Sequence, residues 1–77
     1  MEKIIKISTE YITLGQFLKF SGIISNGAEA KHYLEEYNVL VNGELENRRG
    51  RKLYPEYVVL IDGLSYRIES KWKNVLY

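Results

Sequence analysis

The sequence predicts an α+β fold in which two short helices pack against a small antiparallel sheet. Apolar residues repeat at helical spacing between residues 14 and 37, and from residue 39 onward the spacing changes to that of strands. The dipeptides Asn42-Gly43 and Asp62-Gly63 each follow an apolar run and precede another strand-like segment, as hairpin turns do. A chain of 77 residues has room for one hydrophobic core, so we expect a single domain over residues 1–77.

The first helix has a well-marked start. Thr13 can serve as the N-cap, and Gln16, three residues later, can reach back to the cap and complete a capping box. We therefore predict a helix over residues 14–20 that ends at Ser21-Gly22. A strand over residues 3–8 is expected to precede it, because its isoleucines alternate between two faces.

A second helix start follows five residues after the first helix ends. Asn26 can cap this helix, which we predict to extend to residue 37. Four residues at the spacing i, i+3, i+4 and i+7 share one stripe, which we predict to face the core: Ala30, Tyr33, Leu34 and Tyr37. The short connection requires the two helices to pack as a pair.

Two hairpins are predicted in the second half of the chain. Residues 39–41 and 44–46 flank Asn42-Gly43, which favours a type I′ turn because both central residues need a positive φ. Residues 57–61 form the strongest strand signal, and residues 65–69 would return beside them. The segment that follows residue 69 has no clear periodicity.

The charges are distributed unevenly along the chain, although the net charge is only +1. Residues 1–47 hold four lysines against seven glutamates, whereas residues 48–77 hold seven basic residues against three acidic ones. This asymmetry indicates a local basic face that a polyanion would feel. Its densest part is a predicted loop over residues 47–52, in which Gly50 interrupts four cations: Arg48, Arg49, Arg51 and Lys52.

The composition of this loop allows two interpretations. Guanidinium groups bind phosphate through two parallel hydrogen bonds and stay charged at neutral pH, and Gly50 would let the backbone approach a ligand. Alternatively, the loop is a solvated turn whose cations pair with Glu44, Glu46 or Glu56. Composition and spacing leave both interpretations open.

The order of these elements resembles a known family. Residues 14–31 are similar to the opening helical pair of the S4 RNA-binding domain, and residues 39–43 match its V-x-V-N-G hairpin. This helix-helix-hairpin succession is the alpha-L motif of the family, and the resemblance covers about residues 12–61. Residues 12–18 together with residues 47–53 add a likeness to the small stand-alone S4 proteins of the YaaA type. The chain departs from the family pattern at Gln16 and at Asn26-Gly27, where a basic residue and a Ser-Arg pair are usual.

The resemblance implies binding to structured RNA, either ribosomal or transfer RNA, and an association with the ribosome. We expect a phosphate to face the first turn of the second helix, at the N–H groups of Asn26, Gly27 and Ala28. Lys31 lies one turn further on, and Lys19 would project toward the same side from the end of the first helix. The loop cations would contact the RNA backbone from the opposite side: Arg48, Arg49, Arg51 and Lys52.

Catalysis is not expected from this composition. The chain has no cysteine and a single histidine, His32, so we predict no metal site and no cofactor. Neither a nucleotide-binding glycine-rich loop nor a nucleophile–base pair is recognisable, which disfavours an RNA-modifying enzyme or a small-molecule substrate. The main alternative to RNA binding is a protein-interaction module whose basic loop meets an acidic partner.

Two further expectations concern the cell and the end of the chain. No apolar stretch approaches the roughly 20 residues that span a membrane, and the N-terminus does not resemble a signal peptide. We therefore expect a cytoplasmic protein. Trp72 is predicted either to cover the sheet or to stack on a base.

Overall fold

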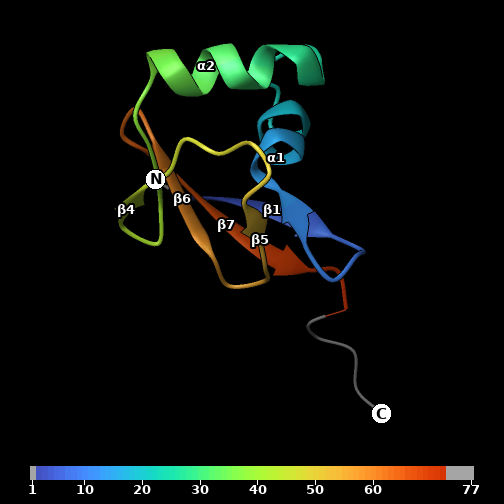
Figure 1. Ribbon diagram of the computed structural model, residues 1–77. Helices are drawn as coiled ribbons and strands as arrows, with labels where there is room; N and C mark the ends of the chain where they lie inside the picture. Colours follow the sequence, from blue (N-terminus) through green and yellow to red (C-terminus); the bar gives the residue numbers. More distant parts are fainter. Residues whose placement is uncertain (1, 73–77) are drawn as a thin grey trace.

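The computed structural model describes residues 2–72. Figure 1 shows two helices lying together beyond one side of a five-stranded sheet, with a smaller strand pair next to the first helix. The large sheet has the strand order β1 (Glu2–Ile7), β7 (Leu64–Ser70), β6 (Val58–Ile61), β3 (Val39–Val41) and β4 (Glu44–Leu45). The small sheet pairs β2 (Ile12–Thr13) with β5 (Lys52–Leu53), and the helical segments are α1 (Leu14–Phe20), the 3₁₀ turn η1 (Gly27–Glu29) and α2 (Ala30–Glu36).

Both predicted helix starts are confirmed. The Thr13 hydroxyl accepts a hydrogen bond from the Gln16 N–H at 3.2 Å, and the Gln16 side chain accepts one from the Thr13 N–H at 2.9 Å, which completes the capping box. Asn26 caps the second helical segment, whose first turn is the 3₁₀ helix η1. The predicted α+β class, with two short helices against a sheet, is therefore confirmed.

The two hairpin turns are also confirmed. Asn42 and Gly43 have φ values of 51° and 86°, and Asp62 and Gly63 have values of 50° and 79°. A positive φ at both central residues is the signature of the type I′ turn. Each turn returns the chain antiparallel to the preceding strand, so β3 pairs with β4 and β6 pairs with β7.

The sheet is mixed, which corrects the prediction of a wholly antiparallel sheet. β1 pairs with β7 in parallel, with Ile5 opposite Ile68. Parallel neighbours need a long connection, and nearly the whole chain lies between these two strands. The sequence gives no local signal for this pairing, because it joins the two ends of the domain.

The basic loop ends in a strand, contrary to the expectation of an irregular loop up to Lys52. Lys52 and Leu53 pair with Thr13 and Ile12, so β5 lies against the residues that lead into α1. Leu53 is fully buried by this pairing. The loop is thereby fixed beside the start of the first helix.

The core lies between the helices and the sheet. Phe17 and Leu18 from α1 are fully buried, and the Phe17 ring meets the edge of Tyr66 with centroids 5.2 Å apart. Ala30 and Leu34 of the predicted α2 stripe are buried as expected. Tyr37 is 55% exposed, so its assignment to the core is wrong. α2 ends at Glu36 and Tyr37 has an extended backbone, so helical spacing no longer sets its direction, and its ring stacks on Tyr33 at 4.5 Å.

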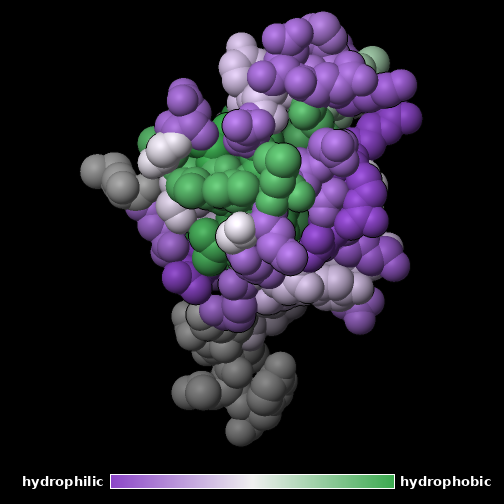
Figure 2. All heavy atoms as spheres, turned by 60° about the vertical axis from the view of Figure 1, so that its left-hand side comes forward, coloured by the Kyte–Doolittle hydropathy of each residue, from purple (hydrophilic) through white to green (hydrophobic). Residues whose placement is uncertain are grey.

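The other face of the sheet carries exposed apolar side chains. Leu40 lies opposite both Leu45 and Leu60 in neighbouring strands, and the latter two are exposed. Figure 2 shows hydrophobic residues gathered in one patch with hydrophilic residues around it. Trp72 is 59% exposed and does not cover the sheet. Residues 73–77, part of the segment without clear periodicity, lie outside the described residues.

Candidate nucleic-acid interface

Two backbone hydrogen bonds dock the basic loop on the first turn of α1. The Leu14 N–H donates to the Arg51 carbonyl at 2.8 Å, and the Gly15 N–H donates to the Arg49 carbonyl at 2.9 Å. The first N–H groups of a helix have no partner within the helix, so these loop carbonyls satisfy them. The loop and α1 therefore form one structural unit.

Gly15 allows a close approach of α1 to two other segments. A Cβ at this position would lie 3.4 Å from the Arg49 carbonyl oxygen and 3.6 Å from the Cβ of Ala30. These distances are ordinary van der Waals contacts, so a methyl group fits at this position. The first helix, the second helix and the basic loop meet at this glycine.

Glu46 organises the arginines of the loop. Its side chain is only 6% exposed, and it accepts hydrogen bonds from Arg48 Nε at 2.8 Å, Arg48 Nη2 at 3.1 Å and Arg51 Nη1 at 2.8 Å. The Arg48 backbone N–H donates to the same carboxylate at 3.1 Å. Hydrogen bonds from Arg48 and Arg51 outweigh the opposing effect of burial and lower the pKa of Glu46 to about 2. The carboxylate is thus charged at neutral pH.

The structure combines the two interpretations of the loop. Arg48 and Arg51 pair with Glu46, as the solvated-turn interpretation expected. Arg48 nevertheless keeps a side chain that is 72% exposed. Arg51 is only 26% exposed, and its guanidinium also lies over the Tyr57 ring at 5.9 Å. Arg51 therefore supports the loop from within, which departs from the expectation that all four cations face a ligand.

Arg49 lies beside the start of the second helical segment. An open hollow, which we call the Arg49 hollow, is lined by these residues: Thr13, Gly15, Gln16, Gly27, Ala30, Arg49 and Gly50. Arg49, Gly50 and Gly27 are exposed there. Within residues 2–72, Arg49 forms no ion pair. The structure thus brings together two of the predicted contact positions, Arg49 and Gly27, which are far apart in the sequence.

The N–H groups at the start of the second helical segment are less available than expected. The Asn26 side chain accepts a hydrogen bond from the Ala28 N–H at 3.0 Å, so this N–H is not free for a phosphate. The Glu29 carboxylate accepts one from the Ser25 N–H at 3.2 Å and places a negative charge beside the turn. Gly27 remains as the residue of this turn that lines the Arg49 hollow.

The three predicted lysines lie in different surroundings. Lys31 is exposed and lines a second hollow together with Glu46 and Asn47, so it flanks the loop. Lys19 is exposed in the last turn of α1 and lines neither of these hollows. The Lys52 ammonium lies 4.9 Å from the centroid of the Tyr11 ring, on which it forms a cation–π contact. Of the two predicted lysines outside the basic loop, Lys31 is therefore the one that lies beside it.

The sequence interpretation did not single out Glu46 as the centre of the loop. Its spacing of two residues before Arg48 and five before Arg51 was visible. The burial of Glu46 could not be seen in the sequence, because burial results from the packing of neighbouring helices and strands. The residues that connect β1 to β2 were missed too, since nothing in their local pattern distinguishes them from an ordinary surface loop.

Comparison with known proteins gives two findings. The sequence pattern of a family described as the S4 domain matches residues 5–69. A protein of Bacillus subtilis (strain 168), named "Probable ribosome maturation protein RlbA", is 59% identical over 59 residues, which cover 77% of this chain and 83% of that protein. No helix within residues 2–72 has the length and apolar character needed to cross a membrane.

Proposed function

This chain belongs to the S4 domain family, and from that premise we propose that it binds structured ribosomal RNA, or a ribosomal particle, during ribosome maturation. The name of the Bacillus subtilis relative supports the link with maturation, since more than half of the aligned residues are identical. The protein acts as a binding module without catalysis, and its place of action is the cytoplasm, where ribosomes are assembled.

The observation that carries this proposal is the Arg49 hollow, in which the basic loop meets the second helical segment across Gly15. A-form RNA presents phosphates and 2′-hydroxyls at its surface and hides its base edges in a deep groove. A small domain therefore binds it with cations at fixed positions. The docking of the loop on α1 fixes Arg49 in this way.

Arg48 and Lys31 extend the same face. Glu46 accepts hydrogen bonds from two nitrogens of the Arg48 guanidinium and leaves the side chain largely exposed. The guanidinium is therefore held in place, and its remaining N–H groups are available to a phosphate. Lys31 lines the hollow on the other side of Glu46. In this proposal the phosphates are contacted by three cations: Arg48, Arg49 and Lys31. Arg51 contacts no phosphate and instead stabilises the loop through Glu46 and Tyr57.

The test compares two variants that remove the same charge from different faces. Arg49→Gln changes the hollow, whereas Arg67→Gln changes the opposite face of the sheet, where Arg67 pairs with Glu2 and Glu56. We expect Arg49→Gln to weaken binding to ribosomal RNA fragments about tenfold, because it removes a charged hydrogen-bonding group. Arg67→Gln should bind like the wild type. Fluorescence anisotropy with labelled fragments gives both affinities.

An acidic polypeptide serves as competitor in the same assay. If it displaced the RNA fragments at equal charge concentration, the protein-interaction alternative would be favoured. Equal affinity of both variants for RNA would remove the Arg49 hollow from the interface.

A further inference from the structure

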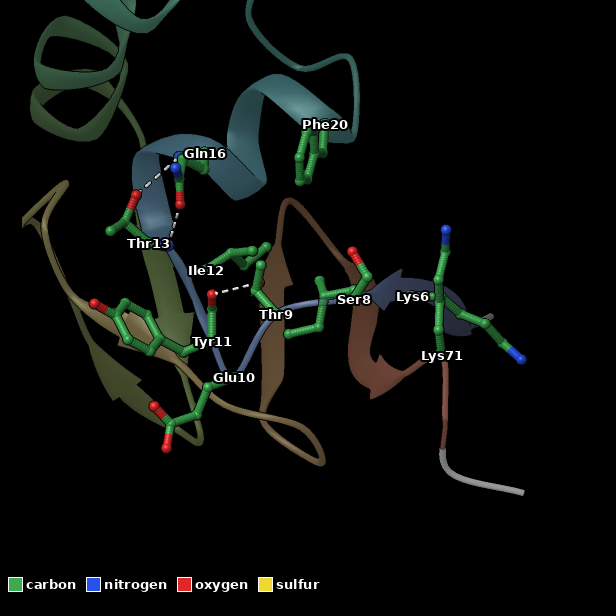
Figure 3. A pocket seen from close by; sticks show the side chains of 11 residues that line it. Lys6, Ser8, Thr9, Glu10, Tyr11, Ile12, Thr13, Gln16, Phe20 and Lys71 are labelled. Atoms are coloured by element: carbon green, nitrogen blue, oxygen red, sulfur yellow. Dashed lines mark hydrogen bonds between the residues drawn. The ribbon is translucent and has the colours of Figure 1, made fainter. Parts of the chain in front are cut away.

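A groove separate from the Arg49 hollow lies between the β1–β2 connection and the end of α1. Figure 3 shows this groove, with the connection over residues 8–11 below it and the last turn of α1 above it. Its volume of about 580 Å³ is in the range of sites that hold small organic molecules. The groove is open on one side, so a chain that runs along the surface can place one group inside it.

The lining of the groove combines an aromatic ring with polar edges. The ring of Phe20 is 65% exposed and points into the groove from the last position of α1 (Figure 3). Ile7 and Ile12 lie beneath and are almost fully buried, so they form a firm apolar floor. Ser8 and Thr9 line the same space with hydroxyl groups. A planar, partly apolar molecule with polar edges matches this lining.

The charge of the groove favours an anionic chain. Lys71 follows β7, and its backbone N–H donates to the Ile7 carbonyl at 2.8 Å, which fixes the residue at the groove. Its side chain extends toward the level of the Phe20 ring, whereas Lys6 and Glu10, which also line the groove, turn away from that ring (Figure 3). Within the described part of the chain, Lys71 forms no ion pair.

The groove lies next to the Arg49 hollow. Thr13 and Gln16 line both of them, one on each side of the start of α1. Lys52, whose ammonium lies over the ring of Tyr11, adds a cation next to the connection that forms the groove. A single nucleic-acid strand that contacts Arg49 would therefore reach the groove across Thr13 and Gln16.

From these observations we propose that the groove binds an unpaired base of the RNA partner, which stacks on Phe20 while Lys71 contacts a neighbouring phosphate. Stacking on an exposed aromatic side chain is tolerant of sequence, because every base has a flat face. The protein would thus contact a helical segment through the Arg49 hollow and an adjacent unpaired nucleotide through the groove. This inference rests on the proposed RNA binding. It adds that the preferred RNA has an unpaired nucleotide next to a helical segment.

The experiment uses two RNA probes and three variants of the full chain. One probe is a hairpin with 2-aminopurine at an unpaired position next to the stem, and the other is a fully paired duplex of the same length. We expect Phe20→Ala to weaken hairpin binding about tenfold and to leave duplex binding unchanged. Phe20→Tyr should retain hairpin binding, because a tyrosine ring stacks equally well. The quenching of 2-aminopurine on binding should disappear only in Phe20→Ala.

Tyr37→Ala is the matched control, because Tyr37 is another exposed aromatic residue and does not line the groove. The inference is overturned if Phe20→Ala binds the hairpin as tightly as Tyr37→Ala does, or if both probes lose affinity equally. Failure of the wild type to bind either probe would count against the proposed function itself. If Phe20→Ala bound both the duplex and the hairpin as the wild type does, the proposal for the groove would be rejected and the proposed RNA binding would stand.

Discussion

At the scale of single residues, Glu46 determines how the basic loop is built. It is a buried carboxylate that receives four hydrogen bonds from Arg48 and Arg51. Such a group stabilises the fold only while it is charged. Its pKa of about 2 in the folded protein lies below the ordinary value of 4.5, so folding favours the deprotonated form.

The pH dependence of stability follows from this shift. Because the folded pKa is the lower one, the stabilisation is fully present above pH 4.5 and is lost as the pH falls toward 2. We expect Glu46→Gln to lower the free energy of unfolding at pH 7 by roughly 2 kcal/mol, and the deficit to shrink below pH 4.5. Urea unfolding of both proteins at several pH values measures this difference.

Glu44→Gln is the control for this measurement, because Glu44 is an exposed carboxylate two residues away. It should have little effect at any pH. A deficit for Glu46→Gln that stays constant between pH 7 and pH 2.5 would contradict the assignment of the shift to the two arginines.

At the scale of elements, α1 and the basic loop meet at Gly15. The loop carbonyls of Arg49 and Arg51 cap the first N–H groups of the helix, and this requires the two backbones to lie close together. The capping box of Thr13 and Gln16 then satisfies the next N–H of the helix. The start of α1 is therefore fully occupied by protein groups, and Arg48 and Arg49 of the loop are exposed beside it.

Substitutions at Gly15 test how tightly the two elements are joined. Gly15→Ala should change stability by less than about 1 kcal/mol, because its methyl group fits at contact distance and alanine favours the helix. Gly15→Leu should cost about 1–3 kcal/mol, because its side chain would push the loop away. Thermal unfolding followed by circular dichroism gives both values.

Gly27→Leu provides the comparison for Gly15→Leu, because nothing lies within 4 Å of a Cβ added at Gly27. If Leu at position 27 destabilised the protein as much as Leu at position 15, helix propensity and not crowding would explain the result.

At the scale of the whole molecule, the positive charge is local although the net charge is +1. Arg48 and Arg49 belong to the basic loop and Lys31 lies beside it, while Arg67 on the other face is neutralised by Glu2 and Glu56. The row of Leu45, Leu40 and Leu60, in which Leu45 and Leu60 are exposed, lies on the face of the sheet away from the helices. The two faces of the protein thus differ in chemical character, and only one of them suits a polyanion.

The dependence of RNA affinity on salt reports how many phosphates this face contacts. Three contacts predict a slope of log affinity against log salt of roughly −2 to −3, because each neutralised phosphate releases counterions. Arg49→Gln should make the slope less steep by roughly one, whereas Phe20→Ala should leave it unchanged because stacking releases no counterions. Titrations between low and physiological salt measure these slopes. An unchanged slope in Arg49→Gln would show that Arg49 contacts no phosphate.

The sequence by itself determined the elements whose signals are local. The capping box of α1 lies within four residues, and each hairpin turn is specified by one dipeptide, so both helix starts and both turns were predictable. The family could also be recognised from the order of these elements. The basic loop was predictable as a cluster of charges, since its cations are adjacent in the chain.

Only the tertiary structure decided how these pieces meet. The parallel pairing of β1 with β7, the burial of Glu46 and the groove beneath Phe20 each depend on residues that are distant in the sequence. Arg48 and Arg51 both bind Glu46, but Arg48 is largely exposed whereas Arg51 is mostly covered by its surroundings. The physical reason is that caps and turns are formed by hydrogen bonds between near neighbours, whereas burial and the shape of a binding surface arise from packing across the whole chain.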